Sequence, residues 1–526
     1  MKTKSIIISA AFACVAMFSA GAQVAQSDEL AFRIKGEAFS NSQIRDLSEF
    51  MTDELGSRLA ASQMKLRAEG LVVGKLAELG FSNPRVEKAY DFAQGGWDNE
   101  KAYAAMTAPY YCAFAVSPKA WSGSTDGLVK GECIILEANS TDDLEKYKGK
   151  LAGKVVLMAE SQTPQLSFEP LASRYTEEEL EEMKMDSRAQ ERRGGYGIPA
   201  NFDMNAYRAR MQLQAEIKAL AAKEKPLCIV TGRGSYNIPS ATSVSYKVGD
   251  PEPVTEIVLP IEDHGRMCRL VRKGEKVEME LEIRNKFTDN QQINNVVAEI
   301  PGTDPKLKDE IVLIGAHLDS WHGSTGAADN ASGCIVMMEA MRIIKALGIQ
   351  PRRTIRIALW GGEEQGLYGS RGYLENYLYQ RKDFKKLPGY DKFALYLNMD
   401  NGSGRFRGIY LEQNDLAFPY FQAWMKPVES LGFTTLTPRN TGGTDHMTFN
   451  GVGLPAFQFI QDELEYDRTY HTMTDTFERL SLNDLTIDAA ITAWLVICAA
   501  NDPGRIPVKP GYPDVLKNMP QRRMMY

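Results

Sequence analysis

Histidine and carboxylate residues recur in the second half of the chain, at the ends of apolar runs that predict β-strands. Of the 5 histidines in the chain, 4 lie beyond Glu310, and Asp329 occupies a loop of glycine and alanine just before a predicted helix. Imidazole and carboxylate groups that converge from separate elements are the ligands of a protein metal site. The pattern therefore predicts a metal centre. Its strand-end residues are His317, Asp319, Glu363, Glu364, Asp400 and His471.

The spacing of these residues suggests different tasks for neighbours. Glu363 and Glu364 are adjacent in a short loop and point in different directions, so one can bind metal while the other acts as a base. Asp319 follows His317 at the spacing of a carboxylate that orients a metal-bound imidazole. A structural turn is the alternative for Asp319.

The elements that must position these residues alternate between strand and helix from Glu310 onwards. Continuous apolar strands alternating with helices predict an α/β sheet covered on both faces, with the site beyond the carboxyl ends of the strands. The predicted strands are Ile311–Ala316, Thr354–Trp360, Phe393–Met399, Gly408–Glu412 and Pro455–Ile460, and the predicted helices are Ser332–Leu347, Leu367–Tyr379, Leu416–Leu431 and Leu482–Ala500.

The first half of the chain has a different texture. Gln43–Leu79 predicts two amphipathic helices, broken near Gly56. Short β-like runs follow between Gly127 and Pro239, interrupted by Tyr175–Lys225, which is dense in Glu, Lys, Arg, Met and Ala. This stretch predicts a solvated helical pair, and a lid or a dimer contact is the alternative.

Taken together, the motifs resemble those of the M28 family of zinc exopeptidases, in the same order along the chain. The subgroup with the greatest resemblance is the plasma glutamate carboxypeptidase (carboxypeptidase Q) type, which carries an inserted protease-associated domain. Ala328 departs from the pattern, because many relatives have a second aspartate there. The matching motifs are AHLDSW at 316–321, GAADN at 326–330, GEEQG at 362–366, NMD at 398–400, GTDH at 443–446 and YHT at 470–472.

The resemblance implies a role for each matching residue. Asp329 would bridge two zinc ions and Glu363 would be the general base. His317 and Asp400 would complete one ion, and Glu364 and His471 the other. Each residue also has an ordinary alternative, such as a buried core histidine, a helix cap or a solvated loop residue.

Further residues near these motifs are less specific. Asp445 and His446 lie in a glycine-rich loop where the family places residues on the substrate side, and a helix cap with a buried polar contact is the alternative. Tyr470 precedes a ligand and could donate its hydroxyl group to an oxyanion, or simply pack. Asp475 could orient the ligand loop or cap the next helix.

The resemblance also implies a fold and a domain order. We expect a mixed, largely parallel sheet flanked by helices, the zinc exopeptidase fold, with a β-rich protease-associated domain inserted in it. The expected divisions are a signal peptide at 1–22, the first part of the peptidase domain at 23–123, the insert at 124–255 with its helical stretch at about 175–225, the main peptidase domain at 256–507, and a tail at 508–526.

Composition and the N-terminal sequence indicate which binding partners and which cellular location to expect. The chain of 526 residues has 61 Lys and Arg against 68 Asp and Glu, a net charge of −7, which disfavours nucleic-acid binding. Lys2 and Lys4, an apolar run and a small-residue cleavage site after Ala22 predict a secretory signal, hence export to the periplasm or the medium. We expect no stable membrane insertion. The scattered cysteines form no thiolate zinc motif.

The function expected from these observations is hydrolysis of terminal peptide bonds by an exported enzyme with two zinc ions. An aminopeptidase is the first expectation, with a carboxypeptidase or dipeptidase on the same centre as the alternative. A non-catalytic receptor on the peptidase fold is the alternative from another class, and the intact ligand set argues against it. Peptides are the expected substrates, and the resemblance is compatible with a homodimer.

Overall fold

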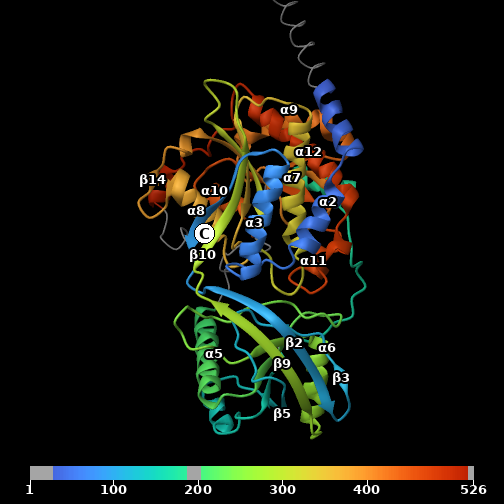
Figure 1. The fold of residues 1–526 in the computed structure, drawn as a ribbon, viewed down its shortest axis with the longest axis vertical. Coiled ribbons are helices and arrows are strands. Elements are labelled where there is room, and N and C mark those ends of the chain that lie inside the picture. The colour runs from blue at the N-terminus through green and yellow to red at the C-terminus, as the bar shows by residue number, and fades with distance from the viewer. Residues whose placement is uncertain (1–27, 161, 186–202, 519–526) are drawn as a thin grey trace, which may run out of the picture.

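The computed structural model describes residues 28–160, 162–185 and 203–518, and the predicted signal peptide lies outside these ranges. The chain forms two stacked bodies, each built on its own eight-stranded sheet (Figure 1). The upper body holds most of the helices, and the lower body contains the long strands β2 and β9 (Figure 1). We call the lower body the inserted unit, because the chain enters it after β1 and leaves it before β10.

The sheet of the upper body has the strand order β1-β10-β12-β11-β15-β18-β16-β17. Its central strands β12, β11, β15 and β18 are parallel to one another, and β10 pairs antiparallel with both β1 and β12. The strands are β1 Ser82–Asp91, β10 Gln292–Ile300, β11 Ile311–His317, β12 Thr354–Trp360, β15 Phe393–Asn398, β16 Phe406–Tyr410, β17 Thr435–Thr437 and β18 Ala456–Gln461.

Helices cover both faces of this sheet. One face packs against α7 (Ser332–Ala346) and α12 (Leu482–Asn501), together with α2 (Ile44–Glu49), α3 (Gln63–Glu78) and α9 (Phe418–Met425). The other face packs against α8 (Tyr368–Tyr373) and α10 (His446–Asn450), around a cluster rich in aromatic residues. This arrangement confirms the predicted mixed α/β fold. The sequence indicated it because strands buried on both faces need apolar residues at successive positions.

The sequence missed the antiparallel strands β1 and β10. Both carry mixtures of polar and apolar residues, and β1 contains Pro84 near its start. Such runs lack the continuous apolar character that reveals the central strands. The pairing of β1 with β10 joins segments about two hundred residues apart, which no local pattern indicates.

The inserted unit has the strand order β3-β2-β9-β5-β6-β7-β8-β4, with α6 (Ile261–Arg272) packed on its core. Its sheet runs beyond the expected range 124–255, because the long antiparallel pair of β2 and β9 belongs to it. That the unit is a protease-associated domain stays a prediction. The strands are β2 Gly96–Ala108, β3 Cys112–Ala113, β4 Ser117–Pro118, β5 Val129–Leu136, β6 Val155–Met158, β7 Cys228–Gly232, β8 Glu256–Leu259 and β9 Glu278–Thr288.

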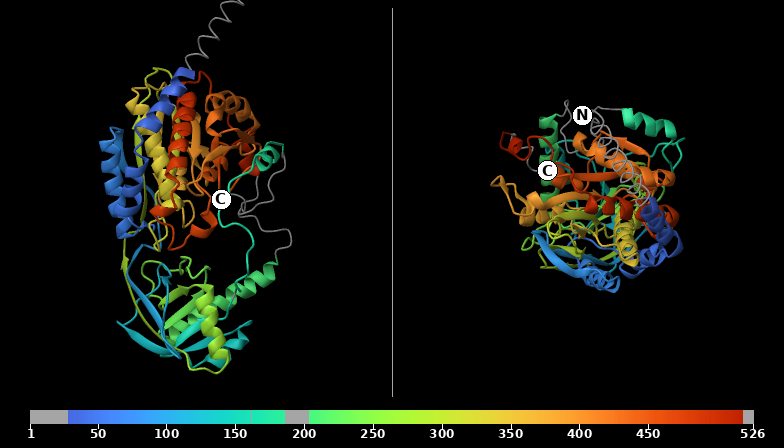
Figure 2. Two further views of the ribbon diagram at one scale, coloured as in Figure 1. Left: turned by 90° about the vertical axis from the view of Figure 1, so that its right-hand side faces the viewer. Right: turned by 90° about the horizontal axis from the view of Figure 1, so that it is seen from above.

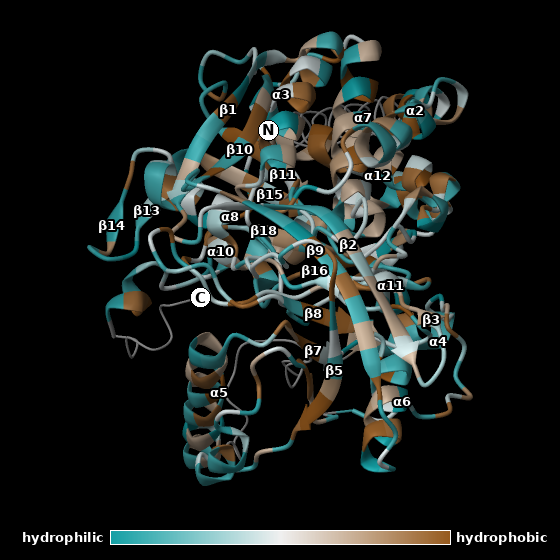
Figure 3. Cartoon of the chain, turned by 60° about the horizontal axis from the view of Figure 1, so that its bottom comes forward, coloured by the Kyte–Doolittle hydropathy of each residue, from teal (hydrophilic) through white to brown (hydrophobic). Residues whose placement is uncertain are grey.

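The stretch Tyr175–Lys225 does not form a helical pair within the described residues. Its first helix, α4 (Glu177–Met185), leaves the inserted unit and docks on the upper body, where Leu180 and Met183 pack on Ile460 (Figure 2). Its second helix, α5 (Met204–Glu224), lies along the inserted unit and is largely hydrophilic (Figure 3). The sequence predicted both helices, but their separation depends on long-range contacts.

Helix α12 is the one described segment long and apolar enough to cross a membrane, and 78% of that window is buried inside the fold. It packs against α7 and the sheet. Its apolar composition therefore serves the core, as expected from the sequence.

Candidate functional site

The candidate site lies at the carboxyl ends of the parallel strands. His317 is the last residue of β11, Glu363 and Glu364 follow β12, and Asp400 follows β15. Asp329 stands in the loop before α7, and His471 in the loop after α11 (Tyr466–Thr469). Because parallel strands end at one edge of the sheet, these side chains converge there.

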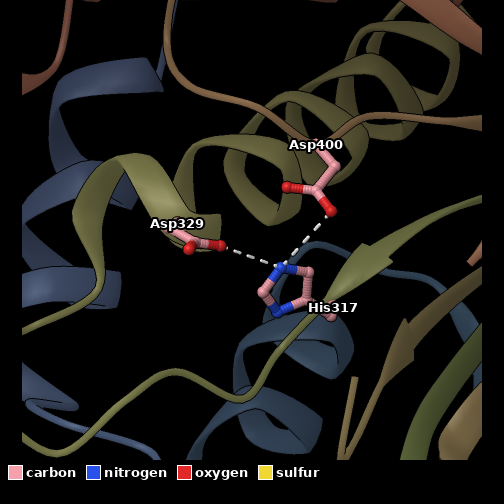
Figure 4. Close-up of side chains that lie close together, drawn as sticks. All are labelled: His317, Asp329 and Asp400. Carbon is pink, nitrogen blue, oxygen red and sulfur yellow. Dashed lines mark ion pairs between the residues drawn. The ribbon is translucent and has the colours of Figure 1, made fainter. Parts of the chain in front are cut away.

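The converging residues form two groups that share Asp329. In the first group, Nε2 of His317 lies 3.1 Å from Oδ1 of Asp329 and 3.6 Å from Oδ2 of Asp400 (Figure 4). In the second, Nε2 of His471 lies 3.3 Å from Oδ2 of Asp329 and 2.9 Å from Oε2 of Glu364. Each carboxylate oxygen of Asp329 thus faces a different imidazole, which is the arrangement of a bridging ligand.

Asp475 holds the loop that carries Asp329. Its two carboxylate oxygens accept hydrogen bonds from the backbone N–H groups of Ala328 and Asp329, at 2.6 and 3.0 Å. The orienting role, one of two alternatives considered from the sequence, is the one that these contacts support. Burial and the neighbouring Asp329 raise the pKa of Asp475 to about 7.

The carboxylate of Asp319 binds the loop of Glu363 and Glu364 and not the imidazole of His317. Its carboxylate accepts hydrogen bonds from the backbone N–H groups of Glu363 and Glu364, at 3.1 and 3.3 Å. Nδ1 of His317 lies 3.0 Å from the carbonyl oxygen of Asp319 and 3.9 Å from its carboxylate. A hydrogen bond from Nδ1–H to this carbonyl leaves Nε2 free as the metal-facing atom.

The charges of the site are strongly perturbed. Burial raises the pKa of Glu364 to about 7, and it also raises the pKa of Glu363 well above its ordinary range. Burial lowers the pKa of His471, but Glu364 and Asp329 outweigh it and raise that pKa to about 10. Burial raises the pKa of Asp329, and its hydrogen bonds with His317 and His471 more than reverse the effect. The carboxyl groups of this site are therefore crowded together, and the two imidazoles are the positive charges that stabilise their ionised forms.

The site opens into a cavity of about 430 Å³. Six carboxylate residues line it, and no lysine or arginine of the described residues does. Four of them are Asp329, Glu363, Glu364 and Asp400, while Glu463 lies in the loop after β18 and Asp467 lies in α11. The cavity is therefore an acidic one.

Tyr470 and Trp321 flank His471. The ring of Tyr470 stacks on the imidazole with centroids 3.7 Å apart, and the ring of Trp321 lies 5.6 Å from it. Tyr470 is 47% exposed and lines the cavity, so its hydroxyl group can reach a ligand there. Its role as a hydrogen-bond donor stays a prediction.

Asp445 and His446 are buried and do not line the cavity. Nε2 of His446 lies 3.2 Å from a carboxylate oxygen of Glu412. Burial raises the pKa of Asp445 to about 7, although a hydrogen bond with Ser370 acts in the opposite direction. A substrate-side role for this pair stays a prediction.

Sequence reasoning missed Arg58. This fully buried side chain donates hydrogen bonds to the carbonyl oxygens of Leu318, Thr325 and Gly326, and so braces the loop between His317 and Asp329 from behind. A charged residue in the break between two predicted helices was the only signal, and it is indistinguishable from an ordinary solvated loop residue.

The two groups are suited to cations. In each one, a histidine and two carboxylates offer ligand atoms that all lie within 4.8 Å of one another. Oε1 of Glu364 is buried and has no hydrogen-bond partner among the described residues. Buried carboxylates without Lys or Arg partners are costly, and bound divalent cations would remove that cost.

Comparisons with known proteins identify the domain that carries this site. Residues 295–495 match the family model described as Peptidase family M28. Carboxypeptidase Q from Mus musculus is 28% identical over 316 residues, which cover 60% of this chain. The matched stretch spans 64% of the length of that curated relative.

Solved structures share the fold. A peptidase M28 precursor from Shewanella amazonensis has a TM-score of 0.65 and 24% identity, over 92% of this chain and 99% of its own. The zinc aminopeptidase BSAP from Bacillus subtilis has a TM-score of 0.54 and 19% identity, over 88% of this chain and 95% of its own. The matched residues 295–495 are similar to peptidase family M28 and contain six residues of the candidate site: His317, Asp329, Glu363, Glu364, Asp400 and His471.

Proposed function

We propose that this protein is an exported exopeptidase with two zinc ions, and that it removes N-terminal residues from peptides. The observation that carries the proposal is the pair of overlapping ligand groups joined by Asp329, with Glu363 beside them in one cavity. His317 and Asp400 would hold one ion, Glu364 and His471 the other, and Asp329 both. Export rests on the predicted signal at 1–22, and a homodimer stays a prediction.

The metal ions and the side chains of the protein would have different catalytic tasks. The metal pair would polarise the scissile carbonyl group and make the attacking water more acidic. Glu363 would accept the proton of that water and deliver it to the leaving amine. Asp319 would keep Glu363 in place through the two backbone hydrogen bonds. The hydroxyl group of Tyr470 would donate to the oxyanion.

The acidic cavity favours an aminopeptidase. After the metals have neutralised their ligands, Glu463 and Asp467 remain on the wall, and no lysine or arginine of the described residues lines it. Such a lining attracts the ammonium group of a peptide N-terminus and repels a carboxylate. The relative from Mus musculus is named carboxypeptidase Q, so a carboxypeptidase on the same centre is the second candidate.

A small peptide panel tests both candidates. Each peptide is offered to the zinc-loaded protein free, N-acetylated and C-amidated, and the products are read by mass spectrometry. We expect N-acetylation to abolish cleavage, and loss of cleavage only on C-amidation would instead establish the carboxypeptidase. Glu363→Gln should lower kcat by about 10²–10⁴-fold and leave two zinc ions bound. Equal activity of this variant would refute the assigned base.

A further inference from the structure

A second cavity of about 790 Å³ adjoins the acidic one. Glu463, Asp467 and Tyr470 line both cavities, so the two meet at these residues. The second cavity also touches Thr472, the neighbour of His471. Its other wall comes from the inserted unit, through residues 231–236 at the end of β7 and directly after it, and through α5. We call it the outer cavity.

The outer cavity differs from the inner one in charge. Four basic residues line it against two acidic ones, Glu463 and Asp467. Two of the basic residues are already paired, one with Glu256 at 2.8 Å and the other with Glu465 at 3.4 Å. No ion pair involves the remaining two, Arg210 and Arg233, within the described part of the chain. The four are Lys119, Arg210, Arg233 and Arg468.

The backbone of Arg233 is anchored next to the ligand loop. Its N–H donates to the carbonyl oxygen of Leu259 at 3.0 Å, and its carbonyl oxygen accepts from Ser240 at 3.3 Å. Ser240 in turn forms an antiparallel bridge with Thr472, the residue after His471. Backbone contacts from Arg233 to Ser240 and from Ser240 to Thr472 thus connect Arg233 to the loop that carries the proposed ligand His471.

The two cavities together match the two ends of a short peptide. The inner cavity suits an ammonium group, and the outer one presents two unpaired guanidinium groups. Arginine binds a carboxylate through two parallel hydrogen bonds. We propose that the outer cavity binds the free C-terminal carboxylate of short peptide substrates, with Arg233 as the main anchor and Arg210 as the second.

This inference rests on the proposed function and makes its substrate class specific. The favoured substrates are peptides of a few residues with a free carboxylate, because a longer chain would have to continue past the basic wall. The inserted unit then acts as a specificity element, since it contributes both arginines while the upper body contributes the ligands.

Kinetics with matched peptides test the assignment. Short peptides with the same sequence are compared as free acid and as C-terminal amide, using the zinc-loaded protein. Amidation should raise KM about 10–100-fold with little change in kcat, the range expected for charge-assisted hydrogen bonds. Arg233→Gln should raise the KM of the free acid by a similar factor. The KM of the amide should change by less than about twofold, because the amide does not use the guanidinium group.

Two controls separate folding and function from specificity. Arg284→Gln removes the same charge from β9, at a side chain outside the outer cavity, and should leave both substrates unaffected. An aminoacyl anilide, which has no carboxylate, reports on the proposed function alone. The Glu363→Gln protein allows the binding of free and amidated peptides to be compared by calorimetry without turnover.

The outcomes distinguish failure of the carboxylate site from failure of the proposed function. If the anilide is cleaved but free and amidated peptides behave alike, the inference is overturned and the proposed function stands. Retention of the preference for free acids in Arg233→Gln, with amide cleavage intact, would equally overturn the role of Arg233. If no substrate is cleaved and the metals are bound, the proposed function fails, and the inference fails with it.

Discussion

The backbone N–H of Ala241 donates a hydrogen bond to the carbonyl oxygen of His471 over 2.7 Å. Ala241 belongs to the inserted unit, and His471 is a proposed metal ligand of the upper body. His471 has a φ of 56°, in the left-handed region that a side-chain-bearing residue seldom adopts without tertiary support. The inserted unit therefore helps to hold a ligand in its unusual backbone conformation.

Replacing Ala241 should weaken one metal site selectively. Ala241→Pro removes the N–H donor, and we expect about 5–10-fold weaker zinc binding at the group of Glu364 and His471, the value of one lost hydrogen bond. The other ion should stay bound. The zinc content of the protein after dialysis against zinc buffers measures this. Ala241→Gly retains the N–H and is the matched control, and equal retention of both ions in the proline variant would contradict the prediction.

Asp319 should control the rate rather than metal binding. Asp319→Asn retains one acceptor oxygen, so it leaves one of the N–H groups of Glu363 and Glu364 unsatisfied and shifts the proposed base. A displacement of about 1 Å costs about 10²-fold in rate, so we expect kcat to fall by that order with KM changed little. Steady-state kinetics and zinc analysis check the prediction. A loss of zinc that accounts for the whole effect would show that Asp319 acts on the metals instead.

Asp445 should make the stability of the metal-free protein depend on pH. Its pKa is about 7 in the fold, against about 3.9 in an unfolded chain. Between these values the folded state keeps the proton and the unfolded state has lost it. Folding stability due to this group therefore falls as pH rises through that window and is lowest above pH 7.

The neutral variant Asp445→Asn should remove this dependence. We expect the wild type to lose about 2 kcal/mol more than the variant between pH 5 and pH 8. Urea unfolding of both metal-free proteins measures the difference. Parallel pH profiles would show that Asp445 titrates normally. A variant with normal peptidase activity would also count against its predicted role on the substrate side.

Removal of metal should destabilise the fold. Without cations, Asp329, Glu363, Glu364 and Asp400 remain crowded at the end of the sheet, and ligand binding stabilises a folded state in proportion to its affinity. We expect a chelator to lower Tm by about 5 °C or more, with recovery on adding zinc. Calorimetry checks this. The stabilisation by zinc should shrink in Asp400→Asn, and an undiminished effect there would place the metal elsewhere.

Much of the architecture was predictable from local patterns. The parallel strands are buried on both faces, so their continuous apolar runs were visible, and the polar residues that follow them mark the edge of the sheet. His317, Glu363, Glu364 and Asp400 could be assigned to one site because parallel strands end together. The motifs in which they lie then indicated the M28 family.

The contacts that complete the site were not predictable in this way. Asp475 holds Asp329 from 146 positions away, and Ala241 reaches His471 from another body of the protein. Arg58 and Arg233 look like ordinary surface cations until the chain is folded. Residue type and spacing reveal which groups bring the chemistry, because strand and helix periodicities are local. The groups that orient them and the wall that faces them depend on long-range packing, which leaves no periodic trace in the sequence.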